Sequence, residues 1–119
     1  MDEKNTRIIT KIIEYAEKVL HYCKDVNEDT FTSDVKLVEA CVFNLIQIGE
    51  LARRFDTEFL EKHKDIPWNQ IRGLRNRIVH DYEGIDLLLI WDIINGDEGG
   101  LTELINKLKK LLNQVKPEK

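Results

Sequence analysis

Arginine is concentrated in the middle of this chain, close to a histidine and a tyrosine. Five of the six arginines fall between positions 53 and 77, whereas the lysines are scattered along the sequence. The grouped residues are Arg53, Arg54, Arg72, Arg75 and Arg77, followed by His80 and Tyr82. A guanidinium binds a phosphate through parallel N–H groups, and an imidazole exchanges protons near neutral pH. The combination indicates an anion site at which phosphate chemistry can occur.

RNA can be cut without a metal ion, because its own 2′-hydroxyl can attack the adjacent phosphate. The cut needs a group that moves protons, which suits histidine, and a cation that stabilises the charge on the phosphate, which suits arginine. We predict these catalytic roles for His80 and Arg75, with support from Asn76, Arg72 and Glu50. Two plainer interpretations stay open, because a histidine near a helix end often caps carbonyl groups and arginines often pair with nearby acids.

The stretch around the arginines is expected to be a helix with two flanks. At about 100° per residue, one flank faces a core with Ile71, Leu74 and Ile78. The other flank holds Arg72, Arg75, Asn76, Val79 and His80. Arg75 and His80 would lie roughly 7.5 Å apart along the axis. The length of arginine could close this gap, the helix could end at His80, or a two-fold dimer could line one cleft with two such pairs.

Four nearby residues each have two interpretations. Arg53 and Arg54 either suit a helix C-terminus electrostatically or bind phosphate together with Arg72. Glu50 either pairs with an arginine of the cleft or is solvated. Trp68 is expected to anchor the core, with stacking against an RNA base as the alternative.

The spacing of these residues resembles the signature of the HEPN superfamily. Arg75 is followed by the polar Asn76 and, after four intervening residues, by His80; the further His80-x-Tyr82 resembles the HepT ribonuclease toxins. Other stretches agree, namely Ile48-Gly49-Glu50-Leu51-Ala52, Ile66-Pro67-Trp68 and Gly84-Ile85-Asp86-Leu87. The resemblance extends over roughly residues 5 to 112.

This resemblance implies a metal-independent ribonuclease toxin of a toxin–antitoxin pair, working as a cytoplasmic homodimer with Arg75 and His80 as catalytic residues. It also implies a partner, a minimal nucleotidyltransferase antitoxin that silences the toxin by transferring AMP to Tyr82. AMP at that position would place an anionic phosphate beside the arginines and block RNA; a packing role is the alternative for Tyr82. Two rival classes are a non-catalytic nucleotide- or substrate-binding partner of a nucleotidyltransferase and a purely structural helical dimer.

The overall composition is that of one globular domain. With 119 residues, 42% hydrophobic and 34% charged, the chain is long enough for a core, and we expect a single HEPN-like helical domain over residues 1–119 with a frayed tail after about 115. A net charge of −4 argues against non-specific coating of nucleic acid but permits a local basic cleft. We expect no membrane span, signal peptide, metal site or cofactor, and Cys23 and Cys41 as reduced core residues.

The apolar periodicity predicts an all-α fold, an up-and-down bundle of four to five helices. Expected helices run from Asn5 or Thr6 to about residue 24, over 34–54, from near Pro67 through the arginines with Asp65 as the cap, and over 87–94 and 101–115. Residues 56–64 are compatible with one further short helix. The second helix is apolar on most sides, so one side should pack inward and another should meet a second subunit. Within it, Gly49 indicates close approach of another backbone.

Overall fold

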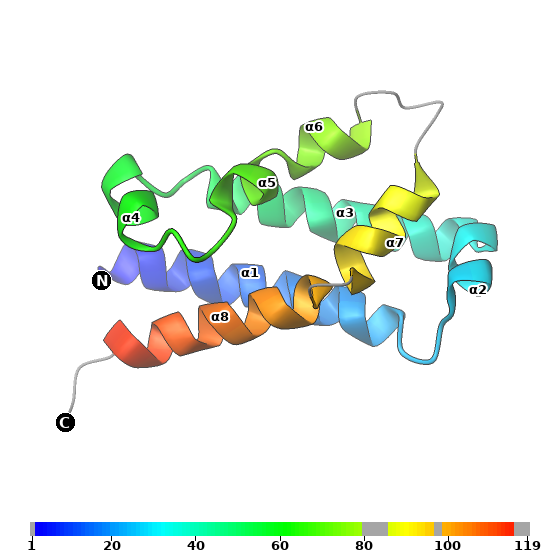
Figure 1. The fold of residues 1–119 in the computed structure, drawn as a ribbon, viewed down its shortest axis with the longest axis horizontal. Helices are drawn as coiled ribbons and strands as arrows, with labels where there is room; N and C mark the ends of the chain where they lie inside the picture. The colour runs from blue at the N-terminus through cyan, green and yellow to red at the C-terminus, as the bar shows by residue number, and fades with distance from the viewer. Residues whose placement is uncertain (1, 80–85, 97–98, 116–119) are drawn as a thin grey trace.

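The structure is a computed structural model and describes residues 2–79, 86–96 and 99–115. All regular structure in these ranges is α-helical, and none of it is strand (Figure 1). The helices are α1 (Glu3–Tyr22), α2 (Glu28–Ser33), α3 (Val35–Ala52), α4 (Thr57–Lys62), α5 (Trp68–Arg72), α6 (Leu74–Val79), α7 (Leu87–Asn95) and α8 (Gly100–Val115). No helix in the described ranges combines the length and the apolar content needed to span a bilayer.

The predicted all-α class is confirmed, but the predicted count of four to five helices is wrong, since the described residues contain eight. One additional helix, α2, lies between the first two expected helices, around the buried ring of Phe31. Another arises because the arginine helix is divided at Gly73 into α5 and α6. Hydrogen bonds continue across this division, from Gly73 N–H to Asn69 O and from Arg77 N–H to Gly73 O.

Asparagine and aspartate side chains cap five of the helices. A side-chain oxygen of Asp2, Asn27, Asp34, Asp56 or Asp86 accepts a hydrogen bond from the backbone N–H three residues later. Asn5 or Thr6 was the expected start of α1, and this is wrong because Asp2 provides the cap one turn earlier. The expected cap at Asp65 is also wrong: α5 begins after Pro67 and has no side-chain cap.

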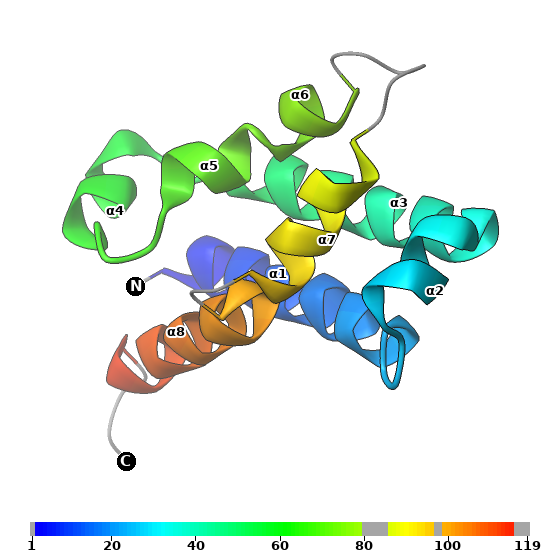
Figure 2. The same ribbon diagram turned by 45° about the vertical axis from the view of Figure 1, so that its right-hand side comes forward.

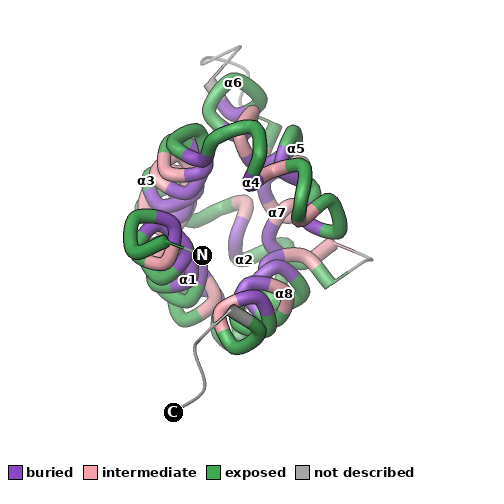
Figure 3. Tube along the Cα trace, turned by 90° about the vertical axis from the view of Figure 1, so that its left-hand side faces the viewer, coloured by how far each residue is buried: buried purple, intermediate pink, exposed green. Residues whose placement is uncertain are grey.

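The core lies between the three long helices. α1 packs on both α3 and α8, and the end-on view shows the buried residues of all three turned toward the inside of the bundle (Figure 3). α1 has an apolar stripe at helical spacing that is buried in the core, with Ile8, Ile9, Ile12, Ile13, Ala16 and Val19. α7 crosses from the end of the molecule near α2 down to α8, as the turned view shows (Figure 2). The apolar periodicity therefore identified the core correctly.

α3 is apolar beyond the part that the bundle buries. Its inward side contributes Val38, Cys41, Leu45, Ile48 and Ala52 to the core. On the opposite side, Val35 and Phe43 keep 69% and 59% of their surface exposed, and Val42 and Ile46 are half-buried. Within one chain, this helix has more apolar surface than its neighbours cover.

Gly49 marks the closest approach between α3 and the α5–α6 segment. A Cβ atom built at Gly49 would lie 3.0 Å from Ile71 O, 3.3 Å from Leu74 Cβ and 3.7 Å from Arg75 N. The predicted close approach of another backbone is therefore confirmed. The absence of a side chain at this position lets the helix that carries Arg75 pack directly on α3.

Gly49→Ala should destabilise the protein, although alanine is the better helix former by about 1 kcal/mol. The added methyl group must push α5 and α6 away from α3, and such overpacking costs typically 1–3 kcal/mol. Thermal and denaturant unfolding measure the difference. The control is Glu50→Ala at the next, exposed position. A Gly49→Ala protein at least as stable as this control would show that the contact between α3 and α6 accommodates a methyl group.

Candidate functional site

The arginine helix has the two flanks that its sequence predicts. Ile71, Leu74 and Ile78 are buried against the core, whereas Arg75 and Asn76 are exposed on α6. Val79 is the last residue of α6, and no side-chain position is described for it. The predicted catalytic His80 and the predicted modification site Tyr82 lie outside the described residues, in the segment that joins α6 to α7. The structure therefore locates the arginine half of the predicted site.

Arg53 and Arg72 meet where the ends of α3 and α5 come together. The Arg53 side chain donates a hydrogen bond from Nη1 to the backbone oxygen of Arg72, at 3.4 Å. Arg72 is itself half-buried, and its Nε is buried with no hydrogen-bond partner among the described residues. Arg53 occupies the C-cap position of α3, but its side chain contacts the carbonyl at the end of α5 and not that of its own helix. Both guanidinium groups keep donors with which they can bind an anion.

One seam between α3 and the α5–α6 segment holds Arg53, Arg72 and Arg75. Arg53 is one turn beyond Gly49 along α3, and on the facing segment Arg72 and Arg75 are three positions apart. Arg54 is exposed directly after Arg53. Among the described residues, the four ion pairs all involve other cations, namely Arg7, Lys62, Lys64 and Lys109. Pairing with nearby acids therefore does not account for the arginine cluster within the described structure.

Glu50 and Asn76 are brought to the same region without direct contacts to the arginines. Both side chains are exposed, and within the described ranges Glu50 makes no ion pair. The solvated interpretation of Glu50 therefore describes the single chain. Glu50 directly follows Gly49, the residue at which the α5–α6 segment packs on α3.

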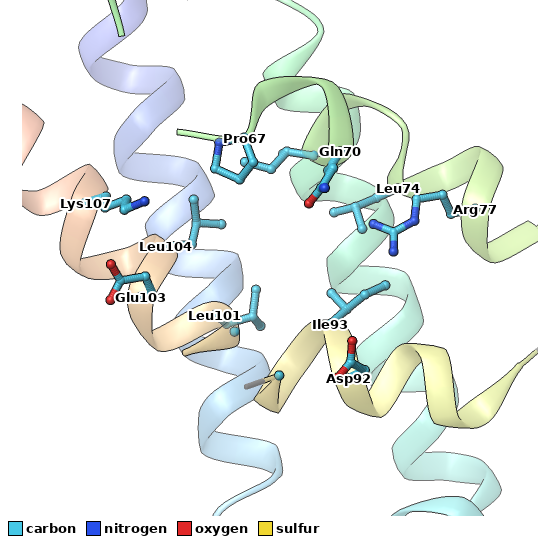
Figure 4. A pocket seen from close by; sticks show the side chains of 13 residues that line it. Pro67, Gln70, Leu74, Arg77, Asp92, Ile93, Leu101, Glu103, Leu104 and Lys107 are labelled. Atoms are coloured by element: carbon cyan, nitrogen blue, oxygen red, sulfur yellow. The ribbon is translucent and has the colours of Figure 1, made fainter. Parts of the chain in front are cut away.

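Arg77 is separated from the other arginines of its helix. It lies two residues beyond Arg75, which on a helix turns it by about 200° to the other side of α6. There it lines a pocket of about 390 Å³ between the α5–α6 segment, α7 and α8, together with Gln70, Leu74 and Asp92 (Figure 4). The position of Arg77 was not predicted, and it excludes this residue from the seam that holds Arg72 and Arg75.

Trp68 belongs to an aromatic cluster in the core. Its ring is 5% exposed and lies 5.0 Å from the ring centre of Phe55 and 5.9 Å from that of Phe59. Its Nε1 donates a hydrogen bond to the backbone oxygen of His63 at 2.8 Å. The predicted core anchor is confirmed, and stacking of Trp68 on an RNA base is excluded by its burial.

His63 packs on the aromatic cluster although two lysines flank it in the sequence. Its ring is half-buried and lies 4.6 Å from the ring of Phe59. Burial lowers the pKa of His63 below the ordinary value of 6.5. His63 therefore has a packing role at the base of the aromatic cluster. In the described part of the chain, no group of three or more His, Cys, Asp or Glu residues is placed to hold a metal ion.

Comparison with known proteins identifies the class. The family model described as "Ribonuclease HepT-like" matches residues 12–111. "Putative RNase MJ1380" of Methanocaldococcus jannaschii is 36% identical over 72% of this chain and 79% of its own length. "Putative RNase TTE0752" of Caldanaerobacter subterraneus is 31% identical over 88% and 91%. "Probable ribonuclease HepT" of Thermococcus cleftensis is 26% identical over 92% and 100%.

The fold and these matches define a helical protein of the ribonuclease class. This chain belongs to the HepT-like ribonuclease family, as the resemblance around Arg75 predicted. No solved structure gives a match to the chain.

Replacing Arg53 and Arg72 by glutamine should weaken RNA binding and its salt dependence. Each lost phosphate contact is expected to reduce the slope of log affinity against log salt by about one. Fluorescence anisotropy with a 2′-O-methyl oligonucleotide, which cannot be cut through a 2′-hydroxyl, measures binding alone. The charge-matched control is Arg7→Gln combined with Lys11→Gln, which removes two exposed cations from α1. Equal salt slopes for the Arg53/Arg72 variant and this control would exclude the seam as a phosphate site.

Proposed function

We propose that this protein is a metal-independent endoribonuclease toxin that cuts RNA with Arg75 and His80 and acts in the cytoplasm. The observation that carries the proposal is the exposed Arg75 on a helix held against α3, five residues before a histidine, in a chain of the HepT-like ribonuclease family. In the described structure no acid pairs with Arg75, so its guanidinium is available to a phosphate.

The proposed mechanism divides charge stabilisation from proton transfer. Arg75 holds the phosphate and stabilises the negative charge that builds up when the 2′-hydroxyl attacks. His80 moves a proton at the attacking or the leaving oxygen. Asn76 orients the phosphate or His80, and Arg53, Arg54 and Arg72 bind the flanking backbone. No step in this sequence requires a metal ion.

The catalytic proposal is tested by Arg75→Ala and His80→Ala. Each should reduce RNA cleavage in excess chelator by at least about 100-fold, because each removes a transition-state interaction of the kind that contributes that much. Circular dichroism should show unchanged helix content. Arg77→Ala, on the other side of the same helix, is the matched control and should keep its activity. Full cleavage by His80→Ala would refute the site, and RNA binding without any cleavage by the wild type would favour the non-catalytic alternative.

The proposed active form is a homodimer joined through the exposed apolar face of α3. This face, with Val35, Val42, Phe43 and Ile46, lies beside Gly49, where α6 packs on the same helix. A two-fold contact there would bring the α6 helices of two chains close together. One shared cleft would then be lined by the Arg75 and His80 of both chains, and the two copies could divide the acid and base roles.

Phe43→Glu should convert the dimer into a monomer and reduce cleavage, since it places a charge in the centre of the proposed apolar contact. Light scattering at micromolar concentration measures the mass. Tyr22→Glu, at an exposed aromatic residue at the end of α1, serves as the control and should remain dimeric. A monomeric wild type, or a Phe43→Glu variant that stays dimeric, would contradict the proposed interface.

The proposed regulation is AMP transfer to Tyr82 by a minimal nucleotidyltransferase antitoxin. Tyr82 is two residues beyond His80, so AMP there would carry a phosphate into the region of Arg72 and Arg75 and exclude RNA. The packing alternative for Tyr82 predicts no such transfer.

Tyr82→Phe should keep RNA cleavage but escape silencing, because phenylalanine lacks the hydroxyl that accepts AMP. The measurement is incorporation of labelled AMP from ATP in the presence of the cognate nucleotidyltransferase, followed by the cleavage assay. Tyr22→Phe is the control and should be modified like the wild type. If Tyr82→Phe is still labelled and silenced, the modified residue lies elsewhere.

A further inference from the structure

The two cysteines of the chain meet inside the molecule. Cys23 ends α1 as its C-cap residue, and Cys41 lies in the middle of α3. Their Sγ atoms are 3.6 Å apart, and the residues are only 9% and 0% exposed. Both are free thiols in this structure, as the sequence led us to expect. They are 18 positions apart, so only the packing of α1 on α3 brings them together.

The geometry is close to what a disulfide needs. A disulfide has an S–S distance of about 2.05 Å, so the sulfurs must approach by roughly 1.5 Å. Cys41 is held within a long buried helix. Cys23 lies at the very end of α1, where the chain turns away through Asp25 at a φ of 62°. The required movement can therefore come from the end of α1 without repacking α3.

We propose that Cys23 and Cys41 are an oxidisable pair. They form an intramolecular disulfide when a low-molecular-weight disulfide acts as the oxidant. The Cys23 thiolate attacks one sulfur of the oxidant, which forms a mixed disulfide and releases one small thiol. The Cys41 thiolate then attacks the Cys23 sulfur and releases the second small thiol. The protein loses two protons and two electrons, and the oxidant is reduced to two thiols.

The order of the two steps follows from burial. Cys23 is at the margin of the core, whereas Cys41 is fully enclosed, so the oxidant reaches Cys23 first. Burial raises the pKa of both thiols and makes the reactive thiolate scarce. Oxidation is therefore slow and needs transient opening at the end of α1, which protects the pair from brief exposure to oxidant.

The Cys23–Cys41 disulfide would stabilise the region where α1, α2 and α3 pack together. The loop that it closes contains all of α2, whose Phe31 packs on Trp91 of α7 with ring centres 5.2 Å apart. α7 in turn starts at Leu87, soon after the segment that carries His80 and Tyr82. The disulfide would restrict the unfolded chain and hold α1, α2 and α3 together. Because α7 packs on α2, its position would be stabilised as well.

The test uses the full chain with oxidised glutathione as the oxidant. After incubation, denaturation and alkylation, the wild type should lose both alkylatable thiols, and its intact mass should fall by two hydrogen atoms. Non-reducing electrophoresis should show single chains. The midpoint of thermal unfolding should rise by about 5–10 °C and return to its starting value with reductant.

Two serine variants test the order of reaction. Cys41→Ser should accumulate one glutathione adduct on Cys23, because the second step is blocked. Cys23→Ser should remain unmodified, because Cys41 is enclosed. A wild type that keeps two free thiols would overturn the proposal, as would one that forms disulfides only between chains. The wild-type mass decides this independently of whether the variants fold.

Discussion

The contact between the backbones of α3 and the α5–α6 segment at Gly49 is the constraint on which the candidate site depends. α6 has only six residues, and a helix this short is not stable by itself in water. It is kept in place because Ile71, Leu74 and Ile78 are buried and because Gly49 allows α3 to approach to contact distance. The same contact turns Arg75 toward solvent. A short helix that presents an arginine at a defined position therefore depends on a missing side chain in its neighbour.

α3 connects the parts of the molecule that matter for function. One side packs on α1 and forms the centre of the core, and Cys41 on this side meets Cys23. A second side, at Gly49, supports the arginine helix, and Arg53 at the C-terminal end reaches the carbonyl of Arg72. The remaining side is apolar and exposed at Val35 and Phe43. In the proposed dimer this side meets a second copy, so one helix would link the core, the site and the interface.

The sequence predicted the long elements well, because an apolar stripe at helical spacing is repeated over several turns. The boundaries of α3, α7 and α8 agree within about two residues, and the two flanks of the arginine helix were assigned correctly. Shorter features were missed. α2 has six residues, too few for a periodic signal, and Asp2, Asn5 and Thr6 are all good caps, so composition could not decide where α1 starts.

Contacts between distant residues were beyond what periodicity can show. The bond from Arg53 to Arg72 and the contact of the two cysteines depend on how the helices pack, and the division at Gly73 depends on a local change of backbone angles. In the site, Arg72, Arg75 and Asn76 were placed on the correct flank, whereas the turn of Arg77 toward the pocket was not foreseen. His80 and Tyr82 lie outside the described residues, so their predicted roles depend on the sequence and the family.

If the 2′-hydroxyl of RNA is the nucleophile at the Arg75–His80 site, the chemistry of the product ends reveals it. A synthetic RNA is incubated with the wild-type protein in excess chelator, and the fragments are analysed by mass spectrometry, beside an RNA with a single 2′-deoxy nucleotide at the cut position. We expect 5′-hydroxyl and 2′,3′-cyclic phosphate ends and no cut in the substituted RNA. Fragments with 5′-phosphate and 3′-hydroxyl ends, or equal cleavage of the 2′-deoxy substrate, would contradict it.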